Sequence, residues 1–173
     1  EDVARADRIV LPGDGAFPAC RQALGSYGGL FEAIEEGVRV KGRPFMGICV
    51  GMQMLATWGR EYRDTPGFDW IGGEVVKITP ADPGLKVPHM GWNTVRQVPH
   101  ALWNGIADGA RFYFVHSYFV QPADPALVTG TCEYGVPFTC AVGRDNIFAV
   151  QFHPEKSARD GLQLLKNFVE WHP

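Results

Sequence analysis

The stretch Phe45-Met46-Gly47-Ile48-Cys49-Val50-Gly51-Met52-Gln53 holds the clearest indication of the fold. The apolar run Phe45–Ile48 predicts a buried strand, and Met52–Trp58 predicts a helix directly after it. Cys49 lies at the turn between them with a glycine two residues away on each side, and a sharp strand-to-helix turn needs such small neighbours because side chains there would collide with backbone. The N-terminus of a helix favours the thiolate form of a nearby cysteine. We therefore expect Cys49 to be a nucleophile exposed on an elbow of an α/β sheet.

The segments around this elbow extend the α/β pattern in both directions. Upstream, Arg8–Leu11 predicts a strand that ends at Pro12-Gly13, and apolar residues every four positions between Leu30 and Val38 predict an amphipathic helix. Downstream, the chain is rich in predicted strands and closes with a helix from about Ala158; the strands are Glu74–Thr79, Val87–Val95, Arg111–Gln121, Leu127–Glu133, Val136–Val142 and Ile147–Phe152. The pattern predicts a single domain, residues 1–173, with a mostly parallel central sheet flanked by helices.

The chain begins in an unusual way for such a sheet. Glu1–Asp7 reads as the end of a connection rather than as a first strand. We expect a βα unit of about 30 residues to precede it.

Composition excludes several classes of protein. The chain has 173 residues, of which 46% are apolar and 20% charged, which is typical of a folded globular domain. With 16 Lys+Arg against 19 Asp+Glu the net charge is −3, and without basic runs we expect no nucleic-acid or membrane partner. No stretch approaches the ~20 apolar residues of a membrane helix, and the polar start shows no signal peptide. The 4 cysteines form no C-x-x-C pair, so reduced thiols and a cytoplasmic location are expected.

A candidate base for Cys49 lies near the end of the chain. His153-Pro154-Glu155 directly follows the strand Ile147–Phe152, at the strand end where open α/β sheets bind their ligands. A turn at Pro154 would let Glu155 orient the imidazole, as a cysteine nucleophile with a histidine base requires. Taken separately, Cys49 also fits a buried structural cysteine, and His153–Glu155 an exposed polar turn; together the two motifs favour catalysis.

These residues resemble the triad-type, or class I, glutamine amidotransferases. In that family the elbow reads G-x-C-x-G-x-Q, here Gly47–Gln53, and the base and its partner read H-P-E. More narrowly, the chain is similar to the glutaminase subunits of imidazole glycerol phosphate synthase over essentially its whole length, through Leu11–Phe17, Pro88–Asn93, Phe114–Tyr118 and Phe152–Ser157. Two features depart from the pattern: the family's first strand is absent, and Asp14 stands where the family often has Val.

The resemblance implies a flavodoxin-like fold and an enzyme of histidine biosynthesis that hydrolyses glutamine without a cofactor. It assigns catalysis to Cys49, His153 and Glu155. The backbone donors that it assigns to the oxyanion hole belong to Val50, Gly13, Asp14 and Gly15. The residues that it assigns to glutamine binding are Gly51, Gln53, His116, Ser117 and Tyr118. Gln53 also fits an ordinary surface position on a helix. We expect no metal, because His89, His100 and His116 lack ligand spacing.

The resemblance also implies a partner, a (β/α)₈-barrel cyclase subunit that receives the ammonia. The expected interface consists of Pro88, Met90, Trp92, Asn93, Tyr113 and Lys156. Trp92 is a suitable anchor because interface anchors are often tryptophan, tyrosine or arginine; alternatively, Trp92 belongs to the core and Lys156 is a solvated charge. Two other functions stay open at this point: the glutaminase subunit of another synthase, of the anthranilate or pyridoxal phosphate type, and a catalytically inactive binding module.

Overall fold

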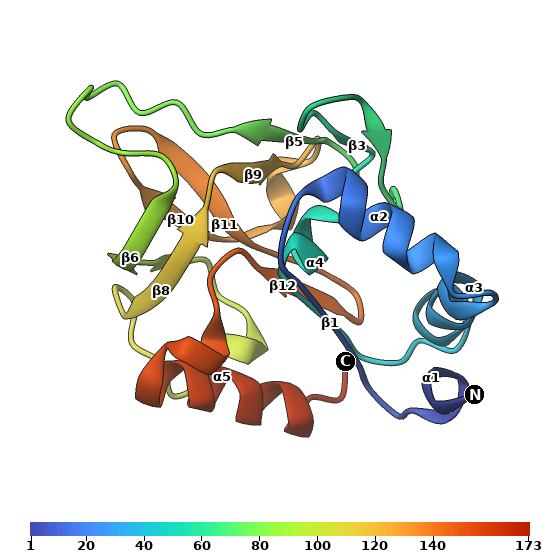
Figure 1. The fold of residues 1–173 in the computed structure, drawn as a ribbon. Coiled ribbons are helices and arrows are strands. Elements are labelled where there is room, and N and C mark those ends of the chain that lie inside the picture. Colours follow the sequence, from blue (N-terminus) through green and yellow to red (C-terminus); the bar gives the residue numbers. More distant parts are fainter.

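The computed structural model describes all residues from 1 to 173 as helices packed around three β-sheets (Figure 1). The helices are α1 (Asp2–Arg5), α2 (Phe17–Ser26), α3 (Leu30–Glu35, continued by a π-helical turn Glu36–Val40), α4 (Val50–Gln53) and α5 (Ala158–Glu170). The strands are β1 (Ile9–Gly13), β2 (Phe45–Cys49), β3 (Trp58–Gly59), β4 (Thr65–Pro66), β5 (Glu74–Lys77), β6 (His89–Thr94), β7 (Arg96–Gln97), β8 (Arg111–His116), β9 (Tyr118–Gln121), β10 (Val128–Glu133), β11 (Pro137–Arg144) and β12 (Ile147–Val150).

The main sheet is mixed, which corrects the expectation of a mostly parallel one. Its six strands run in the order β1-β2-β12-β11-β10-β7; β1/β2 and β2/β12 are parallel, and the other three pairs are antiparallel. The reason lies in the turns: Asp145-Asn146 joins β11 to β12, and three residues join β10 to β11. Connections this short can only join antiparallel strands. The α/β class itself is confirmed.

Two predicted elements differ in the structure, and one helix was not predicted. The predicted helix Met52–Trp58 is wrong beyond its start, because α4 ends at Gln53 and Trp58 belongs to β3. The predicted strand Arg111–Gln121 is broken at Ser117 into β8, which pairs with β6, and β9, which pairs with β5 in a separate sheet. Helix α2 was not predicted, although Pro18 in its first turn is a typical helix-start residue.

Helices cover both sides of the parallel strands. Every residue of β2 and β12 is buried, as expected for strands at the centre of an α/β sheet. Helices α2 and α3 lie to one side of β1, and α5 lies on the other (Figure 1). None of the helices is long and apolar enough to cross a membrane.

The parallel strands bring three distant segments together at one edge of the sheet. Gly13 at the end of β1 is paired with Cys49 at the end of β2, and Ile48 is paired with Val150 at the end of β12. Because parallel strands end at the same edge, the segment after β12, which carries His153, emerges beside Cys49.

Candidate active site

Cys49 has the strained backbone of a nucleophile elbow. Its φ of 55° and ψ of −113° lie in a region that residues with side chains rarely adopt. The flanking glycines are required by space: a Cβ on Gly47 would lie 2.7 Å from the Gly51 carbonyl oxygen, and a Cβ on Gly51 would lie 1.8 Å from that of Leu11. The predicted turn between strand and helix is therefore present, with each glycine packed against backbone.

His153 and Glu155 form the pair that their spacing predicts. His153 Nδ1 lies 2.7 Å from Glu155 Oε1, across the turn that Pro154 opens. An ionised carboxylate can only accept, so the Nδ1–H group donates a hydrogen bond to it, and in the neutral form of the ring Nε2 carries the free lone pair. Nε2 is buried and has no hydrogen-bond partner within the protein. His153 is thus oriented as a base whose acceptor nitrogen is unused.

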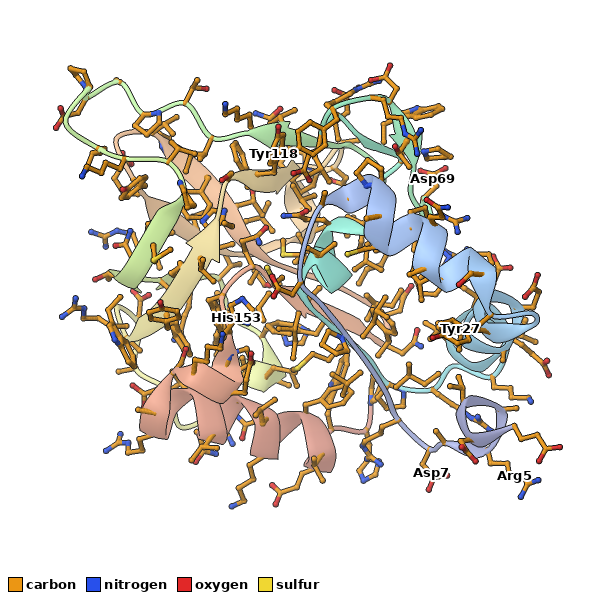
Figure 2. All side chains as sticks on the ribbon, viewed as in Figure 1. Arg5, Asp7, Tyr27, Asp69, Tyr118 and His153 are labelled. Carbon is orange, nitrogen blue, oxygen red and sulfur yellow. The ribbon has the colours of Figure 1, made fainter.

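The loop that carries His153, which is labelled in Figure 2, is tied to β8 by the buried Ser157. Ser157 Oγ donates to the His153 carbonyl oxygen at 2.6 Å and accepts from the Tyr113 N–H at 2.9 Å. The His153 N–H in turn donates to the Tyr113 carbonyl oxygen at 2.9 Å. These bonds fix the backbone of the candidate base against a strand outside the main sheet.

The Cys49 thiol is protonated at neutral pH in this arrangement. Burial, followed by the negative charges of Asp14 and Glu155, raises the pKa of Cys49 to about 11. Hydrogen bonds from the Val50 N–H and from the Gln151 amide oppose this rise in pKa. The sulfur accepts from Gln151 Nε2 at 3.6 Å and makes no hydrogen bond with His153.

Cys49 and His153 face two adjoining pockets. The first, the Cys49 pocket, is lined by Asp14, Gly15, Cys49, Val50, Gln53, Glu61, Pro88, Val115, His116, Ser117 and Tyr118. The second, the His153 pocket, is lined by Pro12, Gly13, Asp14, Ile48, Tyr113, Val115, His153, Glu155 and Lys156. Asp14 and Val115 line both pockets and so lie at their junction. No group of three or more His, Cys, Asp or Glu side chains converges in a way that could hold a metal ion.

Comparisons with known proteins decide the family. The sequence model of the class-I glutamine amidotransferase family matches residues 3–171. The chain is 62% identical over 174 residues to the imidazole glycerol phosphate synthase subunit HisH of Cereibacter sphaeroides, covering 100% of this chain and 82% of that protein. It is 63% identical over 177 residues to the same subunit of Dechloromonas aromatica, covering 99% of this chain and 80% of that protein. The chain belongs to the class I glutamine amidotransferases, and within them to the HisH subunits. Both levels of the resemblance seen in the sequence are confirmed.

Solved structures agree on the fold. A GMP synthase subunit from Thermoplasma acidophilum superposes with a TM-score of 0.70, covering 98% of this chain and 74% of that chain. At 19% identity this likeness shows the amidotransferase fold alone.

The expected glutamine-binding residues of this HisH chain divide into two groups. Gln53, His116, Ser117 and Tyr118 all line the Cys49 pocket, and Gln53 is 3% exposed, which excludes an ordinary surface position. Gly51 lies outside that pocket, beneath the Leu11 carbonyl group. Its position is explained by packing between β1 and α4.

The residues expected at the partner interface also divide. In the two-stranded β6–β8 sheet, Met90 and Trp92 are exposed on one face, where the Trp92 and Tyr113 rings meet edge to face at 6.2 Å. Lys156 is exposed at the His153 pocket beside them. Pro88 lines the Cys49 pocket, and the Asn93 side chain turns to the opposite face of this sheet, bonding His89 Nε2 and the Glu133 carbonyl oxygen.

Two site residues of this amidotransferase were not predicted from the sequence. Gln151 contacts the nucleophile, and Ser157 holds the loop of the base. The signal for Gln151 was a polar residue continuing the fully apolar strand Ile147–Val150 into the core, where an amide needs hydrogen-bond partners. Ser157 gave no comparable signal, because serine after a charged turn is common on surfaces.

Proposed function

We propose that this chain hydrolyses glutamine to glutamate and ammonia with Cys49 as nucleophile, His153 as base and Glu155 as the group that orients the base. The observation that carries the proposal is the 2.7 Å pair between His153 and Glu155, with the unused Nε2, at the same sheet edge as the strained Cys49 elbow. A nucleophile, a base and an orienting acceptor are the three parts that covalent acyl transfer requires.

In the first half of the reaction, the Cys49 sulfur attacks the carboxamide carbon of glutamine. His153 Nε2 takes the thiol proton and returns it to the departing nitrogen, which leaves as ammonia. In the second half, His153 deprotonates a water molecule that hydrolyses the γ-glutamyl thioester to glutamate. Because the resting sulfur bonds Gln151 rather than His153, the proton transfer requires the sulfur and the imidazole to approach each other first.

Charge develops on the carboxamide oxygen when the sulfur attacks. The Val50 N–H is directed at the Cys49 sulfur, which supports a role in the oxyanion hole. A second backbone donor comes from Gly13, Asp14 or Gly15, since Asp14 and Gly15 line the Cys49 pocket and Gly13 pairs with Cys49 across the sheet. Removing one such donor typically costs ~10²–10³ in rate.

We further propose that a cyclase subunit of imidazole glycerol phosphate synthase docks on the exposed face of the two-stranded β6–β8 sheet and receives the ammonia. The two HisH relatives are named as subunits of that synthase. The exposed Met90 and Trp92 beside the charge of Lys156 give an apolar patch with a charged rim, as protein interfaces have. Tyr113 and Lys156 of the expected interface line the His153 pocket, so ammonia that leaves through this pocket would enter the interface rather than bulk water.

The test is glutamate release by the chain with its cyclase partner and that partner's nucleotide substrate. Cys49→Ser is expected to lose hydrolysis by several orders of magnitude while keeping the fold, and adding His153→Ala is expected to change the residual rate little, because the triad acts as a unit. Cys132→Ala removes a buried cysteine away from both pockets and is the matched control. Substantial hydrolysis by Cys49→Ser would show that the elbow is not the nucleophilic site.

A further inference from the structure

We propose that Gln151 is a positioning residue whose side-chain amide orients the Cys49 sulfur with one end and the Gln53 amide with the other. This inference rests on the proposed glutaminase function. It concerns the residue that follows β12, two positions before His153.

Gln151 is held rigidly. Its side chain is 0% exposed, and its N–H donates to the Cys140 carbonyl oxygen at 2.8 Å, which continues the antiparallel pairing with β11. Its Nε2 lies 3.6 Å from Cys49 Sγ, and its Oε1 accepts from Gln53 Nε2 at 3.2 Å. One buried amide therefore touches the nucleophile and a residue of the Cys49 pocket at once.

The orientation of this amide follows from its neighbours. The Tyr118 carbonyl oxygen can only accept, so the Gln53 atom 3.2 Å from it must be the donor Nε2. That same Nε2 lies against Gln151, which must therefore present its oxygen there. The NH₂ group of Gln151 is left facing the sulfur.

The Tyr118 carbonyl group is itself held by a second buried series of hydrogen bonds. It accepts from His116 Nδ1 at 2.8 Å, so His116 Nε2 is the acceptor that faces His89 Nδ1 at 2.9 Å. His89 Nε2 in turn lies 3.2 Å from Asn93 Nδ2. From Asn93 through His89 and His116 to Tyr118, each group donates to the next, so the position of every hydrogen in this series of hydrogen bonds is determined.

Two chemical consequences follow for the reaction. An N–H donor on the sulfur stabilises the thiolate that attacks glutamine, and Gln151 is one of two donors that oppose the effect of burial on Cys49. Both Nε2 hydrogens of Gln53 are donated, one to the Tyr118 carbonyl oxygen and one to Gln151 Oε1. The Gln53 Oε1 atom is therefore available to accept from an N–H donor of the substrate. Gln151 thus favours the thiolate form of the nucleophile and fixes the orientation of the Gln53 amide.

The first experiment compares Gln151→Met with Gln97→Met. Methionine keeps the length of the side chain but removes donor and acceptor; Gln97 also makes side-chain bonds, to the Ile106 and Ala107 carbonyl groups, and lies away from both pockets. Alkylation of the Cys49 peptide by iodoacetamide, followed by mass spectrometry across a pH range, reports the thiol pKa. For Gln151→Met we expect the alkylation midpoint to rise by about one pH unit, a tenfold change in ionisation, with kcat at least about tenfold lower and KM raised.

A second variant, Gln151→Glu, keeps the shape and the acceptor for Gln53 but replaces the donor with a carboxylate. We expect its alkylation midpoint to rise at least as far as in Gln151→Met, while KM for glutamine stays closer to wild type. This difference between the variants is not expected of a residue that only fills the core. The Glu variant also decides the matter if Gln151→Met does not fold.

The proposal is overturned if both variants match Gln97→Met within twofold in alkylation profile, kcat and KM. Alkylation needs no turnover, so it still reports on Gln151 if the wild-type complex releases no glutamate. Absence of glutamate release would contradict the proposed function, whereas the alkylation profiles would still test whether Gln151 acts on the Cys49 sulfur.

Discussion

Asp14 lies at the junction of the two pockets, where its charge acts on the buried Cys49 thiol. Its charge is one of the causes of the raised pKa of Cys49. The Asp14 side chain is exposed, so solvent screens its effect on the pKa of Cys49. Asp14 also lines the Cys49 pocket, where its own backbone N–H is one of the donors proposed for the oxyanion hole. A negative charge here disfavours the thiolate and also the developing oxyanion.

We predict that Asp14→Asn lowers the pKa of Cys49 and raises its alkylation rate near pH 8, because one negative charge beside the sulfur is removed. Glutamine hydrolysis should change by less than tenfold, since the backbone donor is kept. Asp145→Asn is a suitable control, because Asp145 is 84% exposed and lies outside both pockets. A loss of hydrolysis greater than tenfold would mean that the carboxylate takes part in the mechanism.

At the scale of elements, the elbow depends on the close crossing of β1 over the start of α4. Gly51 sits directly beneath the Leu11 carbonyl oxygen, and Gly13 is packed against Val50. Both contacts are with backbone or a Cβ atom, which cannot rotate away. The glycines thus determine how closely β1 approaches the nucleophile.

Gly51→Ala is predicted to destabilise the protein by about 1–3 kcal/mol or more, because forcing a methyl group into packed backbone requires β1 to move. Gly28→Ala is the matched control, since no atom lies within 4 Å of a Cβ added there. Urea denaturation monitored by fluorescence measures both. Equal midpoints for the two variants would contradict the tight crossing.

The elements that could be predicted are those whose signal is local. The elbow and the His153–Glu155 turn were predicted because strand end, glycine spacing and proline are read over a few residues. The break at Ser117 was missed because β8 and β9 are both rich in aromatic residues and valine and lie close together in the sequence, and their pairing with different sheets is what separates them. The buried hydrogen bond between Gln53 and Gln151 was also missed, because a contact between residues 98 positions apart leaves no local pattern in the sequence.

At the scale of the whole molecule, the two-stranded β6–β8 sheet packs against the main sheet through buried histidines. The His89 ring stacks on Tyr134 at 4.1 Å, and the His116 ring lies 5.0 Å from Phe138 of β11. Burial lowers the pKa of His89 to about 4, and burial together with the neighbouring His89 and His153 lowers that of His116 to about 4. Both rings are therefore neutral in the folded protein at pH 7.

We predict that the contribution of these two histidines to the free energy of unfolding is constant above about pH 7.5 and falls as the pH drops toward 4. In this window the unfolded chain binds protons on both histidines and the folded chain does not, so stability must decrease as the pH is lowered. Urea midpoints at pH 7 and pH 5 measure the effect. His89→Gln should reduce the difference between the two midpoints, whereas His172→Gln, at the exposed C-terminal end, should leave it unchanged.

The exposed face of the β6–β8 sheet, which presents Met90 and Trp92, leads to a prediction about assembly. Trp92→Ala is expected to weaken binding of the cyclase by at least about tenfold, because a large exposed ring is a typical interface anchor. Lys156→Ala is expected to reduce stimulation of glutamate release by the cyclase ligand. Titration calorimetry and coupled glutamate assays measure these quantities, and Val169→Ala, an exposed apolar residue on α5, is the control. If neither variant differs from the control, the docking surface lies elsewhere.

The backbone of the elbow has a consequence for protein engineering. Cys49 holds a φ of 55°, a conformation that costs a residue with a side chain about 1–3 kcal/mol and costs glycine far less. Reactivity and heat resistance therefore compete at this position. A library selected only for survival at high temperature would be expected to enrich glycine at residue 49 and to lose the chemistry without disturbing the fold, so screening of this amidotransferase should couple every stability assay to a measurement of turnover.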